Sequence, residues 1–529
     1  MNTEEERQAL QKDLDSKKNT DDRRSLGQFS TPFPLAKEIV TFGLTLLGGK
    51  GTRDVRFMDP AIGTGSFYSA VESACSDERC LSAIGYEIDP HYAMPAKELW
   101  RGHPIEIKIS DFACEPPASF RPNLVVCNPP YVRHHLMHAE RKKELALKAT
   151  TETGVKISGL SGLYCYFMLL ADKWLSEGAI SGWLVPSEFM DVGYGKCLKD
   201  YLLHNVRLVR VHRFDPAEAQ FDDALVSSAV VWFEKGRPDP DGDALFTYGG
   251  THDSPAMSKR VKIAELETER KWTRFPAGEC KKTDVAETLS DYFTVKRGIA
   301  TGNNGFFILS ESKMRGLKVP DEFSVPILPG PRALKADVVT ADSDGNPELP
   351  ERLFLLKCPK MAEEMGRLHP QLCEYLRSGE ENVSKGCLCR SRKEWYSQEE
   401  RRPAPILCSY MGRGSGEKGP FRFILNHSKA IATNSYLMLY PTKRLTEEFG
   451  DGMDVMRAAW EFLNKVSQAE ISGEGRVYGG GLRKVEPREL QRVDVSGFAS
   501  FAANRLESSV EQGGASTRID ASAEPISPR

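Results

Sequence analysis

Residues 57–67 read Phe57-Met58-Asp59-Pro60-Ala61-Ile62-Gly63-Thr64-Gly65-Ser66-Phe67, and this stretch decides the fold. The apolar run Val55–Met58 predicts a short buried strand, and the glycines after it predict a tight turn into a helix. Glycines at such a turn let the backbone approach a ligand where a Cβ would collide. Open α/β sheets bind their ligands at the carboxyl ends of strands. A lone Gly-x-Gly can also be a plain turn, so other residues must support a binding site.

Short apolar runs alternate with helical stretches from about residue 26 to about residue 235, which is the pattern of a doubly wound α/β sheet. A periodic apolar face over Gly162–Ser176 predicts one of the helices. The predicted strands are Val55–Met58, Ala83–Glu87, Ile105–Ile109, Leu124–Asn128, Ile180–Val185, Leu208–Phe214 and Ser228–Phe233.

The length of 529 residues exceeds what one hydrophobic core usually serves, so two domains are expected. The charged residues 1–24 predict an N-terminal helical arm. The first domain is expected over residues 25–240, because the turn-rich stretch Arg237–Asp243 closes it. Less regular alternation predicts an α+β domain over residues 250–505. Residues 507–529 are rich in Ser, Ala, Glu and Gly and predict a disordered tail.

Composition narrows the class of protein. Hydrophobic content of 40% and charged content of 27% are typical of a globular protein, and no apolar run approaches the length of a membrane span. The acidic N-terminus does not resemble a signal peptide, so a cytoplasmic protein is expected. A net charge of −3 argues against a large nonspecific grip on nucleic acid, but it leaves room for a local basic cleft.

The twelve cysteines have no repeating spacing, which favours reduced thiols over a disulfide framework. Cys358, Cys373, Cys387 and Cys389, with His369 among them, could suggest zinc. They contain no Cys-x-x-Cys pair, so we expect no metal there.

Acidic residues follow three successive predicted strands. Asp59 ends the first strand, where a carboxylate suits a cationic amino group. Glu87 ends the second, where it can accept both ribose hydroxyl protons. Asp111 follows the third and offers a carboxylate for a base amino group, with the aromatic ring of Phe112 beside it. One such acid could be a solvated strand end, but three in succession favour a nucleoside-like ligand.

The fourth strand leads into Asn128-Pro129-Pro130-Tyr131. Two prolines force the backbone out of the sheet along a stiff, extended path. An amide oxygen and a prolyl carbonyl aimed at one point would suit an amino group with two N–H bonds to donate. The ring of Tyr131 offers a face on which a planar base can stack.

These segments resemble, in order, the cofactor-binding and catalytic motifs of class I S-adenosyl-L-methionine (AdoMet)-dependent methyltransferases. With Gly27–Pro32 upstream, the order is similar to the gamma-type DNA adenine-N6 methyltransferases of the TaqI-like and PstI-like kind. The resemblance covers residues 25–235 well and the C-terminal half loosely. The cofactor-binding residues it implies are Gln28, Phe29, Thr31, Pro32, Asp59, Pro60, Ala61, Gly63, Gly65, Glu87, Ile88, Asp111, Phe112 and Asn128.

The resemblance also implies the chemistry. Asn128 and the Pro129 carbonyl would accept the two N–H bonds of adenine N6, and Tyr131 would stack on a base extruded from the duplex. Phe221 resembles the residue that covers the other face of the base, although core packing explains it equally well. No Pro-Cys pair suited to covalent attack on cytosine is visible.

Two segments of the C-terminal half resemble parts of the family's target-recognition region. Val295–Phe307 predicts a strand-turn-strand unit with cationic residues beside glycines, and Arg476–Lys484 is similar. Both suit phosphate contact, although any single Arg is more often a solvated surface residue. The expected partners are double-stranded DNA and a functionally paired restriction endonuclease, with the enzyme a bacterial or archaeal monomer.

Three alternatives remain open. A protein-glutamine methylase shares the Asn-Pro-Pro-Tyr motif, because a side-chain amide has the same donor geometry, but such enzymes lack the large C-terminal domain. Adenine in RNA is another alternative substrate, because it carries the same amino group. A catalytically silent AdoMet-binding protein is disfavoured by intact Asp59, Asn128 and Tyr131.

Overall fold

The structure is a computed structural model that describes residues 3–52, 54–75, 81–117, 119–215, 227–277, 287–358, 367–414, 419–478 and 481–515. The chain divides into two compact units. The first comprises Met1–Lys281 with Tyr478–Gly481, and the second comprises the remaining residues.

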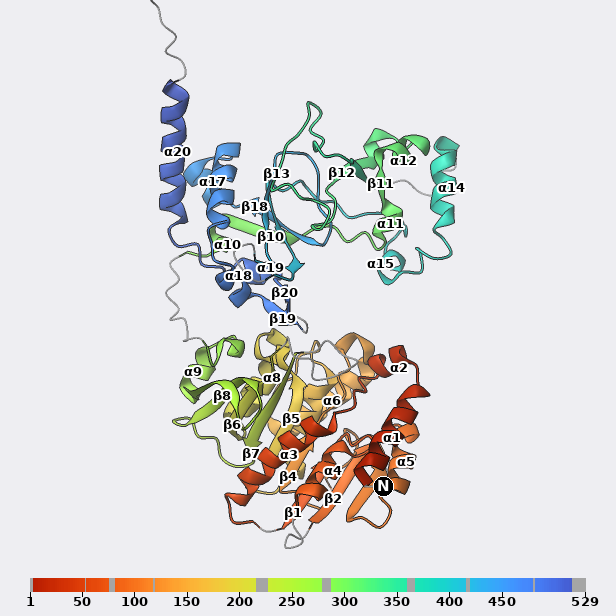
Figure 1. The fold of residues 1–529 in the computed structure, drawn as a ribbon. Helices are drawn as coiled ribbons and strands as arrows, with labels where there is room; N and C mark the ends of the chain where they lie inside the picture. Colours follow the sequence, from red (N-terminus) through yellow and green to blue (C-terminus); the bar gives the residue numbers. More distant parts are fainter. Residues whose placement is uncertain are drawn as a thin grey trace, which may run out of the picture. The chain divides into compact units, whose positions relative to one another are not determined.

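The first unit contains a nine-stranded sheet among its described residues, in the order β3-β2-β1-β4-β5-β7-β6-β8-β9 (Figure 1). The first five strands in this order, from β3 through β2, β1 and β4 to β5, run parallel to one another. Strand β7 lies between β5 and β6 and is antiparallel to both. Their bounds are β1 (Val55–Asp59), β2 (Leu81–Glu87), β3 (Ile105–Ile109), β4 (Leu124–Cys127), β5 (Ile180–Pro186), β6 (Arg207–Arg213), β7 (Ser228–Glu234), β8 (Asp243–Gly250) and β9 (Pro255–Lys262).

Helices cover both faces of this sheet, which explains why its central strands are apolar along their whole length. Phe57 and Leu124 pack into one core, and their neighbours Met58 and Val125 pack into the other, because successive side chains of a strand point to opposite faces. The helices are α1 (Thr3–Ser16), α2 (Thr20–Ser25), α3 (Phe33–Gly48), α4 (Ser66–Ala74), α5 (Pro90–Leu99), α6 (Ala139–Thr153), α7 (Leu163–Leu170), α8 (Lys196–His204) and α9 (Ile263–Thr268).

The predicted α/β fold is confirmed, and each of the seven predicted strands is present with ends shifted by at most two residues. The helix predicted over Gly162–Ser176 is α7 followed by a 3₁₀ turn at Ala171–Trp174. Within the arm predicted over residues 1–24, the described part forms α1 and α2, and α1 packs against α4 and α5 of the same unit.

The predicted end of the first domain is wrong. Arg237–Asp243 connects β7 to β8, and β8 pairs in parallel with β6 inside the same sheet. Strand β9 then pairs with β8 at the edge. Three of its eight residues are basic and five are exposed, so it carries no apolar run that would predict a strand. The first unit therefore extends to Lys281 instead of residue 240.

The second unit mixes short sheets with helices, so the α+β expectation is confirmed. Five strands form its main sheet in the order β10-β18-β15-β17-β13, with smaller sheets β11-β14-β12 and β16-β20-β19. The strands are β10 (Phe293–Arg297), β11 (Ile308–Ser310), β12 (Ser324–Ile327), β13 (Val338–Val339), β14 (Leu353–Leu356), β15 (Ile406–Ser409), β16 (Met411–Gly412), β17 (Phe423–Asn426), β18 (Tyr436–Pro441), β19 (Arg476–Tyr478) and β20 (Leu482–Lys484).

Apolar clusters lie on both faces of the main sheet. The helices of this unit are α10 (Leu289–Tyr292), α11 (Asn304–Phe307), α12 (Glu311–Gly316), α14 (Pro370–Ser378), α15 (Cys387–Arg390), α16 (Lys443–Phe449), α17 (Met453–Leu463), α18 (Gln468–Glu474), α19 (Pro487–Leu490) and α20 (Phe498–Ala515).

Helix α20 corrects the prediction for the C-terminus. It runs to Ala515, so the first part of the tail predicted as disordered over 507–529 is helical, and residues 516–529 lie outside the described ranges. None of the helices in the described part of the chain is long and apolar enough to cross a bilayer.

Candidate active site

Four strand ends meet at one edge of the first sheet. Strands β3, β2, β1 and β4 are consecutive neighbours, and all run in the same direction. Asp59 ends β1, Glu87 ends β2, and Asn128 follows β4 directly. The predicted acidic and amide residues therefore gather on the edge where parallel sheets bind ligands.

The glycine loop after β1 is a true strand-to-helix turn with open space beside it. Gly63 and Gly65 both have positive φ angles, of 55° and 94°, which favour glycine. A Cβ at Gly65 would lie 2.6 Å from Trp100 Nε1, whereas a Cβ at Gly63 would meet no atom within 4 Å. The backbone at Gly63 is thus exposed to an approaching ligand.

Glu87 closes the same cradle from β2. Its carboxylate accepts hydrogen bonds from the backbone N–H groups of Gly63 (3.1 Å) and Asp89 (2.9 Å). Burial, together with the negative charge of Asp89, raises the pKa of Glu87. The next side chain, Ile88, is 62% exposed and leaves an apolar surface beside this carboxylate.

Asp59 is the most deeply buried acid of the site, with 1% of its surface exposed. One carboxylate oxygen accepts a 3.0 Å hydrogen bond from the backbone N–H of Ala61. Burial, and secondarily the charge of Glu87, raises the pKa of Asp59 to about 7. A ligand that brings a positive charge to this carboxylate would remove much of that cost. Pro60 is buried behind it, and Ala61 is half-buried.

The third strand end differs from expectation in one respect. Asp111 accepts a hydrogen bond from the N–H of Ala113 (3.0 Å) and forms an ion pair with Arg141. The ring of Phe112 is 2% exposed and packs in the core against Tyr86 and Trp174. It therefore presents no free face to a ligand in this structure. Arg141 lies on α6, thirty residues from its partner, and no sequence motif indicated it.

The side-chain amide of Asn128 is held on one side only. Its nitrogen donates to the carbonyl oxygen of Phe29 (3.0 Å) and to the hydroxyl oxygen of Thr31 (3.1 Å). Its oxygen, Oδ1, is buried and accepts no hydrogen bond. The upstream segment predicted by resemblance is thus in contact with the predicted catalytic residue, and it leaves one buried acceptor open.

Hydrogen bonds hold Tyr131 both at its side-chain hydroxyl and at its backbone. Its hydroxyl donates to the carbonyl oxygen of Leu184 (3.0 Å), and its backbone N–H donates to the carbonyl oxygen of Gly27 (3.3 Å). Gly27 has φ +66°, and a Cβ there would lie 2.3 Å from the Tyr131 nitrogen. The half-buried ring lies 5.8 Å, centroid to centroid, from Phe29. Of the intervening prolines, Pro129 is buried and Pro130 half-buried.

The other predicted site residues are Gln28, Pro32 and Phe221. Gln28 hydrogen-bonds Asp89 (2.9 Å) and Lys18 (2.7 Å), and Pro32 is exposed at the start of α3. Phe221, predicted to cover the second face of the base, lies outside the described residues. Its place in the site therefore remains a prediction.

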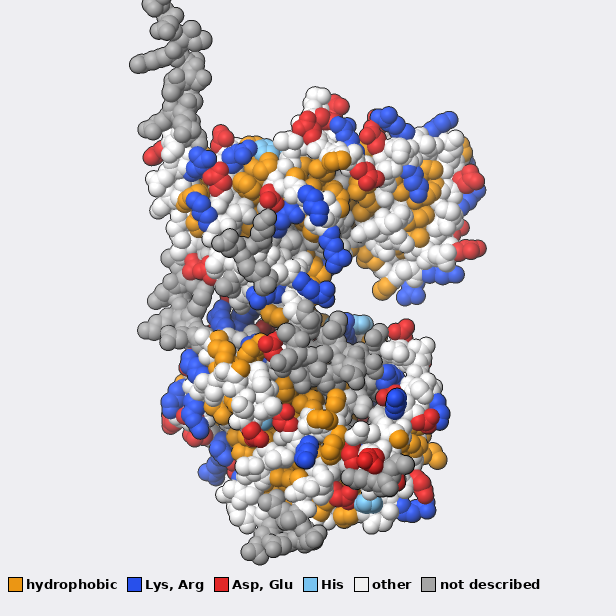
Figure 2. Space-filling view, in the orientation of Figure 1, with side chains coloured by type: hydrophobic (Ala, Val, Ile, Leu, Met, Phe, Trp, Pro, Cys, Tyr) orange, Lys and Arg blue, Asp and Glu red, His pale blue; other side chains and the backbone are white. Residues whose placement is uncertain are grey.

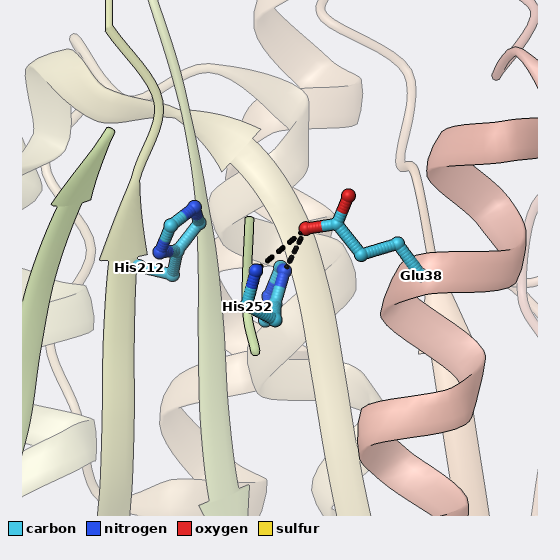
Figure 3. A group of neighbouring side chains, drawn as sticks. All are labelled: Glu38, His212 and His252. Carbon is cyan, nitrogen blue, oxygen red and sulfur yellow. Dashed lines mark hydrogen bonds and ion pairs between the residues drawn. The ribbon is translucent and has the colours of Figure 1, made fainter. Parts of the chain in front are cut away.

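One group of potential metal ligands was not expected from the sequence. Glu38 of α3, His212 of β6 and His252 after β8 place potential ligand atoms within 4.8 Å of one another, the sole such group in the ranges that the structure describes (Figure 3). Glu38 accepts hydrogen bonds from the His252 backbone N–H (2.7 Å) and ring Nδ1 (2.8 Å).

The geometry of this group favours a hydrogen-bonded clamp over a metal centre. The centroids of the two imidazole rings lie 4.4 Å apart with the rings tilted by 37°, so the rings pack against each other. A metal ion, in contrast, binds imidazole nitrogens in the plane of each ring. The Arg210 guanidinium donates to the His252 carbonyl oxygen (2.7 Å) and adds a positive charge nearby. Burial lowers the pKa of His212 to about 2, so this ring stays neutral. The described cysteines are free thiols, as predicted.

In the second unit, the two segments predicted to contact DNA adjoin each other. The Arg297 guanidinium lies 4.0 Å from the centroid of the Tyr410 ring, and Lys484 Nζ lies 5.0 Å from the same ring. Basic side chains gather over this region around β10, β19 and β20 (Figure 2). The strand-turn-strand prediction for Val295–Phe307 is only partly right, because the helical turn α11 precedes β11.

Models of two protein families match successive parts of the chain. The Eco57I restriction-modification methylase model matches residues 120–221, which include the Asn128 loop. The model of the C-terminal domain of type II methyltransferase M.Eco57I matches residues 277–524.

Curated relatives match across both units. Type II methyltransferase M.AccI of Acinetobacter calcoaceticus is 26% identical over 504 residues, which cover 92% of this chain and 88% of the relative. Type II methyltransferase M.XamI of Xanthomonas campestris pv. amaranthicola is 27% identical over 491 residues, which cover 90% and 86%.

Solved structures support the fold. The type IIL restriction-modification enzyme MmeI, solved in complex with DNA, superposes with a TM-score of 0.56 at 12% identity, covering 94% of this chain and 78% of that chain. The DrdV–DNA complex gives a TM-score of 0.52 at 12% identity, covering 92% of this chain but only 57% of that one.

The methyl donor of such enzymes is AdoMet, and the cradle fits it. In such a complex Asp59 would present a buried carboxylate to the amino group of AdoMet, and Glu87 would accept from the ribose hydroxyls. Gly63 would present an open backbone and Ile88 an apolar surface. Two family models in the right order, two relatives aligned over almost their full length and this cradle lead to one conclusion: the chain belongs to the gamma-class type II restriction-modification methyltransferases of the Eco57I family.

Proposed function

We propose that this protein transfers a methyl group from AdoMet to the N6 amino group of an adenine extruded from double-stranded DNA. The observation that carries the proposal is the open, buried Oδ1 of Asn128. A buried acceptor without a partner costs about 1–3 kcal/mol, and an amino group of the substrate would supply the missing hydrogen bond.

The amide is oriented before substrate arrives. The Phe29 carbonyl can only accept a hydrogen bond, so the Asn128 nitrogen has to face it and Oδ1 is the end left without a partner. Oδ1 and the Pro129 carbonyl would accept the two N–H bonds of the base. This arrangement favours a localised nitrogen lone pair and stabilises the positive charge that develops there during transfer.

Alignment supplies most of the remaining acceleration. AdoMet carries its methyl group on a sulfonium that already activates it. The chain contributes the carboxylates Asp59 and Glu87 on one side and Asn128 on the other, which fix the reacting groups relative to each other. The target nitrogen becomes acidic only after it is alkylated, so no general base has to act before transfer.

Tyr131 would act as a stacking surface. Its hydroxyl donates to the Leu184 carbonyl, and burial raises its pKa well above the usual value, so the phenol stays protonated. A ring fixed by its hydroxyl can stack on a planar base. A base inside a duplex cannot reach this pocket, and the target would have to be flipped out. Phe221 is proposed for its second face.

The basic region around Tyr410 is proposed to contact DNA phosphates in the second unit. Arg297 is exposed, and its guanidinium is preorganised by stacking on the ring. We propose that the protein works as a monomer and modifies host DNA in the cytoplasm. A restriction endonuclease of the same specificity would be its functional partner.

The test is to map the product. The protein is expressed in a host free of DNA methylation, and modified bases are located by single-molecule sequencing and nucleoside analysis. The expected result is N6-methyladenine within one recurring sequence. Methyl groups on cytosine N4 would overturn the adenine assignment. Tritium transfer to RNA or to protein glutamine, with none to duplex DNA, would support the alternative substrates instead.

A further inference from the structure

The N-terminal helix α1 lies against the cofactor cradle and contacts it at two separate points. Arg7 and Gln11 of this helix reach the glycine loop, and Lys18, just after its end, reaches Asp89 in the loop after Glu87. We infer that this helix is a working part of the AdoMet site, with Arg7 and Lys18 as positioning residues that set cofactor affinity.

The first contact is centred on Thr64, between the two glycines of the loop. Its hydroxyl accepts from Arg7 Nη1 (3.1 Å) and donates to Gln11 Oε1 (2.7 Å). Its carbonyl accepts from Trp100 Nε1 (2.9 Å). The Thr64 hydroxyl therefore donates one hydrogen bond and accepts another, and both partners lie on α1.

Arg7 is itself preorganised for this contact. Only 2% of its surface is exposed, and its guanidinium pairs with the carboxylate of Glu4 at 2.7 and 2.8 Å. Although burial alone would raise the pKa of Glu4, hydrogen bonds from Arg7, Ser69 and Gln8 keep it below the usual value. A paired, buried charge that still donates to Thr64 restricts the loop more strongly than a solvated side chain would.

The second contact is centred on Asp89. Lys18 pairs with this carboxylate and also donates to Gln28 Oε1 (2.7 Å), while Gln28 donates to the same carboxylate (2.9 Å). The backbone N–H of Asp89 donates to Glu87 (2.9 Å). Lys18 thus joins the arm, the upstream segment and the loop that presents Glu87.

Charge gives Lys18 a role beyond packing. Glu87 and Asp89 are two nearby carboxylates, and the ammonium of Lys18 offsets their mutual repulsion. Without it, Glu87 would be a poorer acceptor for ribose hydroxyl protons. The inference concerns only the cofactor, so it does not depend on which base receives the methyl group.

The test compares two neighbouring lysines. Lys18→Met removes the bridge, and Lys17→Met is the matched control, because Lys17 is 60% exposed on its side chain and pairs only with Asp13 among the ion pairs described. The dissociation constant of S-adenosylhomocysteine is measured by calorimetry on the full chain. Lys18→Met should weaken binding about tenfold, which corresponds to about 1.4 kcal/mol, while Lys17→Met should change it by less than about twofold.

The Arg7 contact is tested with its ion-pair partner. In the double variant Glu4→Gln/Arg7→Met no buried charge is left unpaired. It should weaken S-adenosylhomocysteine about tenfold but methylthioadenosine, which lacks the amino-acid part, by less than about threefold. Lys18→Met should weaken both ligands alike, because its contact lies on the side of Glu87.

Further readouts separate positioning from general stability. Lys18→Arg keeps the charge and should restore affinity to within about threefold. In turnover assays the KM for AdoMet should rise while kcat at saturating AdoMet and the Kd for DNA stay unchanged. Variants that melt at the wild-type temperature and bind S-adenosylhomocysteine with wild-type affinity would overturn the inference. So would a fall in kcat without any change in affinity.

Discussion

The side-chain nitrogen of Asn128 donates a 3.0 Å hydrogen bond to the backbone carbonyl oxygen of Phe29. The two residues are 99 positions apart in the chain. Because a backbone carbonyl cannot donate, this bond determines which end of the amide is left without a partner. The segment before α3 therefore orients the residue that the proposed chemistry needs most.

Asn128→Ala should lower kcat by about 10²–10³, because the variant loses a hydrogen bond that strengthens in the transition state. The dissociation constant of S-adenosylhomocysteine should change by less than about threefold. Single-turnover methylation and calorimetry measure the two quantities. Wild-type turnover by Asn128→Ala would show that the amide is not part of the reaction.

Tyr131→Ala should weaken base stacking, whereas Tyr131→Phe should largely preserve it, because only the hydroxyl bonded to Leu184 is lost. DNA carrying 2-aminopurine at the target position should brighten on binding the wild type and Tyr131→Phe. Tyr131→Ala tests whether the flipped base is retained. Unchanged fluorescence with all three proteins would count against extrusion.

AdoMet affinity should depend on pH through Asp59. With a pKa raised to about 7 by burial, this carboxyl is largely protonated in the free enzyme at pH 6. Binding a cationic amino group requires the ionised form, so affinity is fully present above the free-enzyme pKa and falls as pH drops below it. A tenfold loss per pH unit is the limit for one proton. Calorimetry between about pH 5.5 and 7.5 should show this slope in wild type and a weak, flat profile in Asp59→Asn.

Arg297→Ala should weaken DNA binding similarly for specific and nonspecific duplexes and lower the salt dependence of log K by about one unit, as expected for one lost phosphate contact. Fluorescence anisotropy at several salt concentrations measures this. Arg315→Ala is a matched control, since that exposed arginine lies on α12 and pairs with Glu311. Equal effects of the two variants would exclude a specific role for the Tyr410 region.

Glu38→Ala should destabilise the first unit by about 2–3 kcal/mol, because both donors of His252 would remain buried without an acceptor. Glu38→Gln keeps an acceptor oxygen and should cost less. Denaturant unfolding measures the difference. Zinc should leave the melting temperature of the wild type unchanged, and a rise on adding zinc would contradict the clamp interpretation.

Much of the catalytic unit could be predicted because local signals agree there. Leu124–Cys127 is apolar throughout, since both faces of the sheet are covered, and the prolines after it end the strand. Strand β9 gave no such signal, because an edge strand with one exposed face needs few apolar side chains. The turn-rich stretch Arg237–Asp243 was therefore interpreted as the end of the domain.

The positions of the candidate site residues could be predicted where they stand at strand ends, whereas partners from distant segments could not. Asn128 and Glu87 stand at strand ends and could be placed from the sequence. Their partners could not, because nothing in the arm marks Lys18 or Arg7 as different from other charged residues on a helix. Phe112 shows the reverse error, since an aromatic ring beside an acid can equally well serve the core.

The last two strands of the sheet, β8 and β9, determine where such an enzyme could be recombined with its relatives. A chimera joined near residue 240 would remove them and leave the backbone of β6 without a neighbour on one side, a template for aggregation. Exchanging the C-terminal half near residue 282 keeps all nine strands with the unit that contains the Asn128 loop. Grafting of new sequence specificity should therefore succeed at the later junction and yield insoluble protein at the earlier one.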